Sequence, residues 1–320
     1  MNRNFKTSSM TEAAMISGIL VIFAYLSWFV LPSLMIFYPI PAIILAKRKG
    51  FKYSVLSLIV SDIIISMLLG IQTGIYFLIL LTPFGIVMSY CIIKDENPYR
   101  TIMMSAMTFL LSFVAIVLAT QAIMGVNFVK QMTDIFNETM IIYKDMMSNM
   151  LKSDTARLDA YFKQLEDMSK VMEYMLSHLL PALLIVSSVV TTALNYFIAR
   201  WLGKRFKIDI RKSEGFSMFS FPRTFIIAMA VLLLLSFLMS VFNINVQIIQ
   251  MNIFMISFFA MFVQGLAVLK FYLQKMNVSR LVMTLIIITV IIMAEAGIML
   301  ALVGIADLIF DLRKIRHKVV

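Results

Sequence analysis

The basic residues of this chain alternate with long apolar runs, and this alternation limits what the chain can fold into. Six of the 28 Lys and Arg residues fall in residues 127–173, and the others flank apolar runs at alternate ends. Loops that stay on the cytoplasmic side of a membrane carry an excess of Lys and Arg. The pattern therefore predicts an all-α, polytopic transmembrane helix bundle with a cytoplasmic N-terminus.

Composition supports a membrane class and excludes several others. Charged residues make up 14% of the chain and hydrophobic residues 61%, whereas soluble domains carry about 25% charged residues. The net charge of +11 does not indicate nucleic-acid binding, because the positive-inside rule already explains where the basic residues lie. A single cysteine, Cys91, excludes an internal disulfide and a cysteine-based zinc cluster.

The apolar runs predict about eight spans followed by a C-terminal hydrophobic helix or hairpin. They cover residues 13–31, a short return segment at 34–46, and then 53–70, 75–93, 101–125, 177–199, 225–242 and 251–272. The first run is long enough to span, so we interpret it as a transmembrane helix and not as a cleavable signal peptide. Residues 281–306 form either one tilted helix or a hairpin that turns near 294–297. The positive-inside rule favours the hairpin, which keeps the basic tail inside.

Residues 127–176 differ from the rest of the chain, with six basic and eight acidic residues and hence a net charge of −2. Apolar residues recur there at helical spacing in two stretches: Phe128, Met132, Ile135, Met146 and Met150, and then Leu158, Tyr161, Leu165, Met168, Met172, Met175 and Leu179. Ser153 to Thr155 supply a turn between them. We expect an extracytoplasmic helical hairpin whose helices pack on each other, or else a lid or partner-binding arm.

Several segments resemble the YybS-like family of bacterial integral membrane proteins, whose function is unknown. They are Thr11 to Met15, the basic loop Lys47 to Gly50, Gln264 to Ala267, and the end from Gly304 to Lys314 with its Gly-x-x-Asp and Asp-x-Arg-Lys pattern. The resemblance covers essentially the whole chain. It implies a multi-pass protein of a bacterial cell membrane.

The N-terminal half is also similar, more distantly, to the substrate-binding (S) components of energy-coupling factor transporters. That likeness implies a six-helix membrane domain over residues 1–200, with 127–176 as an insertion, and a C-terminal transmembrane region over 201–320. It also implies a helix-packing face at Ala14 and Gly18 for a membrane partner, because small residues four apart allow close helix approach.

Polar residues within the spans are the first candidate site. Asp62 lies in the middle of a predicted span, where a buried acid is costly and therefore a functional candidate. Together with Gln72, Gln121 and Asn195 it predicts a polar cavity, although the same groups also serve as structural hydrogen-bond partners in membrane helices. Glu295 is interfacial if the chain turns there, and is otherwise a second intramembrane acid.

The loops and the tail supply further candidates. Asp307, Asp311 and Arg313 stand at helical spacing, and we expect them to anchor the tail by an ion pair, with the basic loop at 200–223 as a candidate partner. The basic cluster itself reflects topology or binds anionic lipid headgroups. His178 has only His317 as a second histidine, so we expect no metal site.

No catalytic or cofactor motif is present, since the chain lacks a phosphate-binding loop, an H-E-x-x-H pair and a G-x-S-x-G elbow. We therefore expect a protein that is not an enzyme and has no cofactor. Its partners are the lipid bilayer and either a small-molecule ligand, bound for transport, or a membrane protein. In the second case the chain is a scaffold or regulator that uses the outer hairpin or the basic loop. We expect no nucleic-acid partner.

Overall fold

The computed structural model describes residues 2–125, 127–150, 155–212, 215–241 and 246–315, and within these ranges it contains helices and no strand. The prediction of an all-α helix bundle is confirmed. The chain forms two compact units: unit 1 comprises residues 1–135 and 187–213, and unit 2 comprises 136–186 and 214–320. The two units are defined only by the compactness of the fold. They do not test the predicted division into residues 1–200 and 201–320, which stays a prediction.

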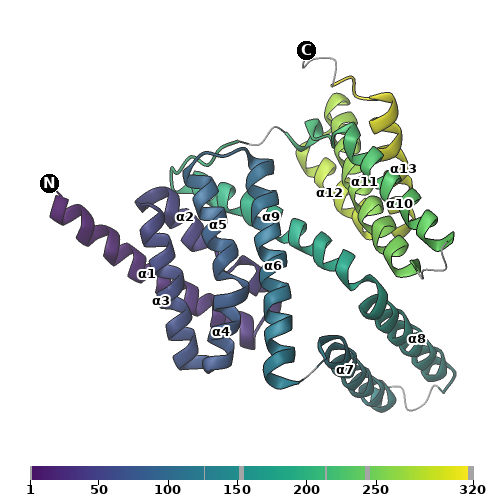
Figure 1. Ribbon diagram of the computed structural model, residues 1–320, viewed down its shortest axis with the longest axis horizontal. Helices are drawn as coiled ribbons and strands as arrows, with labels where there is room; N and C mark the ends of the chain where they lie inside the picture. The colour runs from purple at the N-terminus through teal and green to yellow at the C-terminus, as the bar shows by residue number, and fades with distance from the viewer. Residues whose placement is uncertain (1, 126, 151–154, 213–214, 242–245, 316–320) are drawn as a thin grey trace. The chain divides into compact units, whose positions relative to one another are not determined.

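Unit 1 is built from the N-terminal helices and the later part of a long helix that returns to it (Figure 1). Its elements are α1 (Asn2–Phe29), the 3-10 turn η1 (Pro32–Phe37), α2 (Ile40–Lys49), α3 (Phe51–Leu69), α4 (Ile71–Leu80), α5 (Thr82–Ile93), α6 (Pro98–Met124), the start of α7 (Phe128–Met150) and most of α9 (Leu180–Arg205). Gly50 and Gly70 separate α2, α3 and α4 with φ of 108° and 97°, in a region that favours glycine. The core around Leu20, Tyr38 and Phe77 is fully buried.

Unit 2 contains the rest of α7 and α9 together with the C-terminal helices. Its elements are α8 (Thr155–Tyr174), the π-helical turn η2 (Met175–Leu179), the 3-10 turn η3 (Phe216–Met218), α10 (Arg223–Val241), α11 (Gln247–Lys275), α12 (Arg280–Ile292) and α13 (Ala294–Phe310). Two glycines let α11 and α13 cross at backbone contact. A Cβ added at Gly265 would lie 1.9 Å from the Leu300 carbonyl oxygen, and one at Gly304 would lie 2.0 Å from that of Met261. Small residues of this kind are how membrane helices approach closely.

Among the described residues, six helices are long and apolar enough to cross a membrane, or seven if a bent pair counts as one span. The six are Thr7–Phe29, Phe51–Leu69, Ile71–Ile93, Pro98–Ala122, Leu158–Arg205 and Gln247–Lys275. The predicted count of about eight is not reached within the described residues. The return segment at 34–46 forms part of η1 and of the ten-residue α2, and within α10 the residues 224–239 form an apolar stretch that is not counted among the six.

The bent pair is α12 and α13, which meet at an angle of 106°. Met293 stands between them in an extended conformation, so the chain breaks beside the predicted turn at 294–297. Glu295 lies exposed in the first turn of α13, where the helix dipole favours an acidic residue. The side on which the C-terminus lies stays a prediction.

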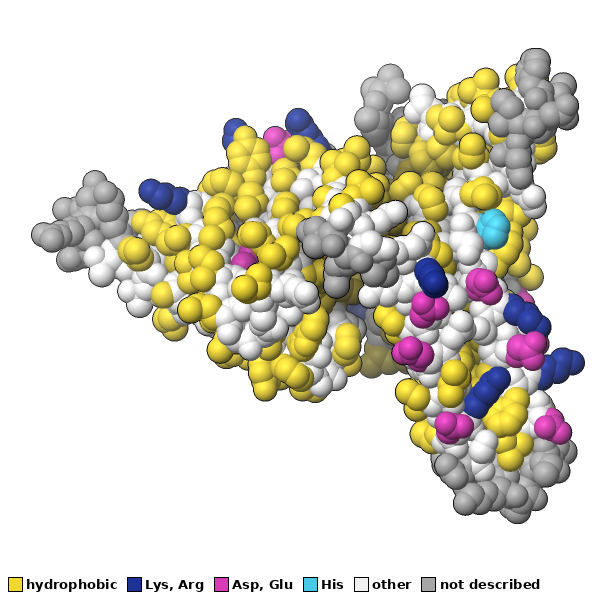
Figure 2. Space-filling view, turned by 60° about the horizontal axis from the view of Figure 1, so that its bottom comes forward, with side chains coloured by type: hydrophobic (Ala, Val, Ile, Leu, Met, Phe, Trp, Pro, Cys, Tyr) yellow, Lys and Arg dark blue, Asp and Glu magenta, His cyan; other side chains and the backbone are white. Residues whose placement is uncertain are grey.

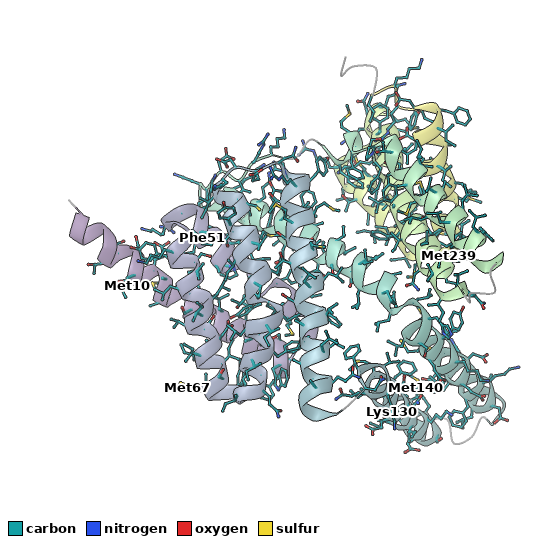
Figure 3. All side chains as sticks on the ribbon, in the orientation of Figure 1. Met10, Phe51, Met67, Lys130, Met140 and Met239 are labelled. Carbon is teal, nitrogen blue, oxygen red and sulfur yellow. The ribbon has the colours of Figure 1, made fainter. Side chains whose placement is uncertain are left out.

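Large apolar side chains remain exposed along the helices, as expected for surfaces that face lipid. Met67 is 80% exposed and Met239 is 42% exposed, and both are labelled with Phe51 in Figure 3. An exposed apolar surface of this extent is rare on soluble proteins. The exposed apolar side chains of these helices therefore need a covering apolar environment, as the interior of a lipid bilayer provides.

Candidate functional site

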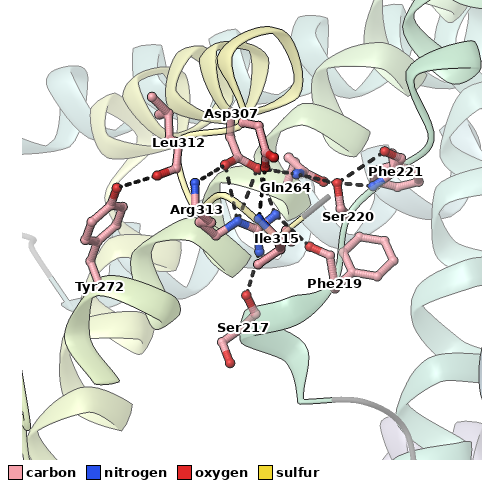
Figure 4. Close-up of polar contacts among 11 residues, drawn as sticks. Ser217, Phe219, Ser220, Phe221, Gln264, Tyr272, Asp307, Leu312, Arg313 and Ile315 are labelled. Carbon is pink, nitrogen blue, oxygen red and sulfur yellow. Dashed lines mark hydrogen bonds and ion pairs between the residues drawn. The ribbon is translucent and has the colours of Figure 1, made fainter. Parts of the chain in front are cut away.

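A buried polar cluster in unit 2 joins the two segments on which the C-terminal family resemblance rests (Figure 4). The Gln264 side-chain nitrogen donates to Asp307 Oδ2 at 2.6 Å. The Arg313 guanidinium forms an ion pair with the same carboxylate at 2.8 Å, and the side chains of both residues are almost fully buried. The cluster therefore links α11, α13 and the chain that follows α13.

The same cluster fastens the C-terminal segment to the end of the basic loop. Arg313 donates to the carbonyl oxygens of Ser217 at 2.6 Å and Phe219 at 2.9 Å. Gln264 Oε1 accepts from the Phe221 backbone N–H at 3.0 Å. The guanidinium is thus bound to a carboxylate and two carbonyls, the kind of pairing that a buried charge requires.

The structure brings together two of the three residues predicted to anchor the tail. Asp307 and Arg313 pair directly, whereas Asp311 ends α13 in a left-handed conformation, and its carboxylate accepts from the Ile315 backbone N–H at 3.3 Å. The pairing of Gln264 with Asp307 was not predicted from the sequence. Whether the cluster serves as a tail anchor in function stays a prediction.

Asp62 lies in a second buried cluster, in unit 1. Its two carboxylate oxygens accept hydrogen bonds from the hydroxyls of Tyr38 at 2.8 Å and Thr82 at 2.6 Å. The Tyr38 hydroxyl also lies 2.7 Å from the Ser61 hydroxyl. Hydroxyls from Tyr38, which follows η1, and from α3 and α5 thus surround the acid. The stripe of Ser54, Ser57 and Ser61 on α3 is the sequence signal for such a polar interface.

The other residues of the predicted polar cavity lie elsewhere. Gln72 and Gln121 are exposed. Asn195 is fully buried, and its side-chain nitrogen donates to the carbonyls of Ile36 at 3.0 Å and Thr191 at 2.9 Å. The contact with Ile36 joins α9 to η1. The polar groups around Asp62 are thus hydroxyls, and not the predicted glutamine amides.

The predicted packing face on α1 points away from unit 1. Ala14 and Gly18 are exposed, and a Cβ added at Gly18 would meet nothing within 4 Å. The neighbouring Ala13 and Ser17 are buried instead, and Ser17 donates to the Ser57 carbonyl at 3.1 Å. The chain therefore leaves the small-residue face of Ala14 and Gly18 uncovered.

Three predicted cytoplasmic loops meet at one end of unit 1. The Lys47 ammonium forms an ion pair with Asp95, and the Arg211 guanidinium donates to the Asp95 backbone carbonyl at 2.7 Å. Arg48 pairs with Glu12 of α1 at 2.9 Å. Because these contacts are direct, the basic loops after α2, α5 and α9 share one side with the N-terminal part of α1.

The α7–α8 segment carries charges of both signs among apolar side chains, as the surface in Figure 2 shows. Leu165 of α8 is only 5% exposed. Ser169 donates to the Asn137 side-chain oxygen at 2.8 Å, and the Lys144 ammonium lies 5.8 Å from the centre of the Phe162 ring. The two helices are therefore in side-chain contact, while the outer-side hairpin stays a prediction because its turn at 151–154 lies outside the described residues.

The α7 face that contacts α8 differs from the predicted stripe. Ile135 and Met146 of that stripe are 49% and 47% exposed, whereas Asn137 and Lys144 make the contact. Phe136 and Met140 also line pockets shared with α8, so α8 lies to one side of the predicted stripe. Helical spacing identifies an apolar face, but it does not identify what covers that face.

An open groove of about 510 Å³ runs along α8, and we refer to it as the α8 groove. It is lined by Phe136 of α7 and by Ala160, Lys163, Gln164, Asp167, Met168, Val171, Met172 and Met175. Three of its residues are methionines, whose unbranched side chains adapt to different partners. His178, beyond the groove, stacks on Tyr174, and no group of three metal-ligating side chains occurs among the described residues.

The helices and their exposed apolar surface define a multi-pass membrane protein. The family comparison agrees, because the model described as "Predicted membrane protein (DUF2232)" matches residues 14–308. The chain belongs to this family.

An uncharacterised Bacillus subtilis (strain 168) protein, YybS, is similar to the chain, with 22% identity over 311 residues that cover 96% of this chain and 98% of that protein. The resemblance to the YybS-like family is thus confirmed. No solved structure matches the chain. The likeness to S components stays a prediction.

Proposed function

We propose that this protein is a non-catalytic membrane protein that binds a protein partner through the α8 groove. The observation that carries the proposal is the open, methionine-rich groove of about 510 Å³ on a segment with charges of both signs. Its exposed residues include Met168 at 48% and Val171 at 58%. Apolar residues left open on a charged segment are typical of interaction sites.

The form of the groove favours a protein segment over a small molecule. Small-molecule sites enclose most of the ligand's surface, whereas this groove follows one face of α8 with Phe136 at its edge. An amphipathic helix or an extended apolar segment fits such a surface, with side chains at helical spacing as anchors. The charged Lys163 and Asp167 supply a polar edge for orientation.

The two buried acids support a non-catalytic protein, because each is engaged in structural contacts. Asp62 accepts from two hydroxyls that join α3 to neighbouring elements. Asp307 holds Arg313 and Gln264. Both carboxylates thus join helices together.

A second candidate function is transport-linked small-molecule binding, in which unit 1 docks a membrane partner. The observation that favours it is the uncovered face of Ala14 and Gly18, with open space where a Gly18 side chain would stand. Such a face suits close approach of a partner helix. It agrees with the resemblance of the N-terminal half to S components.

The orientation belongs to the same proposal. The basic loops share one end of unit 1, through Lys47, Asp95 and Arg211, and their charge indicates the cytoplasmic side. Residues 127–176 carry a net charge of −2, which suits the outer side. The α8 groove would then face the extracytoplasmic space.

Site-specific photocrosslinking tests the proposal with a matched pair of neighbouring positions. A photoreactive amino acid at Val171 lies in the groove, whereas one at Lys170 lies on the same helix but not in the groove lining. In native membranes we expect a discrete protein adduct from position 171 and none from 170. Proteoliposomes of pure lipid should give no adduct from either. Equal adducts from both positions, or none from 171 in native membranes, would contradict the proposed binding site.

A further inference from the structure

Helix α7 has two faces of opposite character. At 100° per residue, most of its apolar residues fall within a sector of about 160°. All of its charged residues stand outside that sector: Lys130, Asp134, Glu138, Lys144 and Asp145. We define the α7 apolar face by its exposed members Ile135, Ile142, Tyr143 and Met146. Lys130, on the charged side, and Met140, at the boundary, are labelled in Figure 3.

Helix α8 does not cover the α7 apolar face. Its polar contacts with α7 run through Asn137 and Lys144, and Phe136 and Met140 line pockets shared with α8, whereas the four residues of the α7 apolar face line neither pocket. Ile142 is 68% exposed and Tyr143 is 44% exposed. A helix with a continuous exposed apolar stripe requires a second surface to bury it.

Chain connectivity places the start of α7 beside the membrane. Only residues 125–127 separate it from α6, whose segment Pro98–Ala122 is apolar and long enough to span. Gly125 ends α6 in a left-handed conformation with φ of 66°, and the Asn127 side chain accepts from the Lys130 backbone N–H at the start of α7. Three residues reach about 10 Å at most.

An aromatic contact ties the first turn of α7 to the spanning helix α6. The Phe128 ring, in the first turn of α7, packs edge-on against Phe113 of α6 with the ring centres 5.7 Å apart. Phe113 lies within the apolar span and not at its end. The first turn of α7 is therefore held against the side of the membrane-spanning helix α6.

From this connectivity and this face we propose that α7 lies along the membrane surface, with its apolar face buried at the boundary between lipid headgroups and acyl chains. An amphipathic helix with a strongly charged opposite face binds in this way, and Tyr143 suits the interface because its ring is apolar and its hydroxyl polar. The helix carries two basic and three acidic residues, a net charge of −1. Apolar burial, and not attraction to anionic headgroups, therefore holds it on zwitterionic lipid.

This arrangement is independent of what occupies the α8 groove. It uses the face of α7 that α8 leaves exposed, and it orients the pair of helices so that the charged side of α7 faces water. The proposal would hold even if the groove had no partner.

Fluorescent labels on single cysteines test the proposal in the full chain. With Cys91→Ala as background, Ile142→Cys and Met146→Cys place the label on the α7 apolar face, and Asp134→Cys places it on the charged face of the same helix. The labelled proteins are reconstituted into phosphatidylcholine vesicles that contain lipids with nitroxides on the acyl chains. We expect severalfold stronger quenching at 142 and 146 than at 134, and the reverse order with a water-soluble quencher.

Two outcomes would overturn the proposal. Equal quenching at the three positions by the water-soluble quencher would show that α7 stands in water. Shielding of 142 and 146 from water without quenching by the lipid nitroxides would show that protein, such as a second copy of the chain, covers the face. Two label positions on the apolar face ensure that one poorly folding variant does not decide the result.

Discussion

The crossing of α11 and α13 at Gly265 and Gly304 predicts that one substitution, glycine to alanine, has opposite effects at two positions of α13. At Gly304 an added Cβ would lie 2.0 Å from the Met261 carbonyl oxygen and 2.9 Å from the Gly265 backbone nitrogen. Both atoms are backbone, so no side-chain rotation relieves the overlap. At Gly297 the nearest atom would be 3.9 Å away on the Phe262 ring, which is ordinary van der Waals contact.

The magnitude follows from two opposing terms. Forcing an extra methyl group into a packed interface costs about 1–3 kcal/mol, and the rigid backbone contact places Gly304→Ala near the upper end. Alanine regains about 1 kcal/mol of helix propensity at either site. Gly304→Ala should therefore destabilise unit 2 by about 2 kcal/mol, and Gly297→Ala should leave it unchanged or more stable by up to about 1 kcal/mol.

Thermal melting of the purified protein in detergent, followed by circular dichroism and by loss of the monodisperse size-exclusion peak, measures the difference. For a unit of this size about 2 kcal/mol corresponds to a lowering of Tm by about 4–8 °C. Gly265→Ala should behave like Gly304→Ala, because its Cβ would lie 1.9 Å from the Leu300 carbonyl oxygen. Equal Tm values for the 297 and 304 variants would refute the close crossing.

Three further predictions concern buried side chains. Arg313→Met leaves the Asp307 carboxylate buried without its charge partner and should cost about 3–5 kcal/mol; adding Asp307→Leu should recover part of the lost Tm, and an unrecovered double variant would contradict the pairing. Leu165→Asp places a charge in the contact between α7 and α8, where Leu165 is 5% exposed. Limited proteolysis should therefore cut the α7–α8 segment faster. The control Val171→Asp, at a site that is 58% exposed, should not change the cleavage rate. Asp62→Leu removes the acceptor of two buried hydroxyls, and each hydroxyl left unpaired costs about 1–3 kcal/mol. Thermal melting should therefore show a lower stability for Asp62→Leu than for Asp62→Asn, which keeps one acceptor oxygen. A stable Asp62→Leu protein that fails a complementation assay would instead assign the acid a functional role.

Hydropathy and charge were sufficient to predict the helical class and favoured the break near residue 294, whereas the family resemblance rested on particular segments such as Gly304 to Lys314. The helical class and the break depend on local composition, and a bilayer allows few alternatives for an apolar run. The ion pair of Asp307 with Arg313 was also within reach, since the residues are six apart across the end of one helix.

The sequence did not predict the hydrogen-bond partners of Asp62, nor did it predict which face of α7 contacts α8. Tyr38 and Thr82 come from elements distant in sequence, and their approach depends on how η1, α3 and α5 pack. The predicted count of about eight spans is not confirmed within the described residues, because the short α2 is apolar but has only ten residues.

Single-cysteine labelling in intact cells tests the orientation on which the proposed binding site depends. In a Cys91→Ala background, Asp159→Cys on α8 and Asp209→Cys in the basic loop are both exposed and are treated with a membrane-impermeant maleimide before and after permeabilisation. The proposed orientation predicts that position 159 is labelled in intact cells and position 209 only after permeabilisation. Labelling of 159 only after permeabilisation would contradict an extracytoplasmic α8 groove.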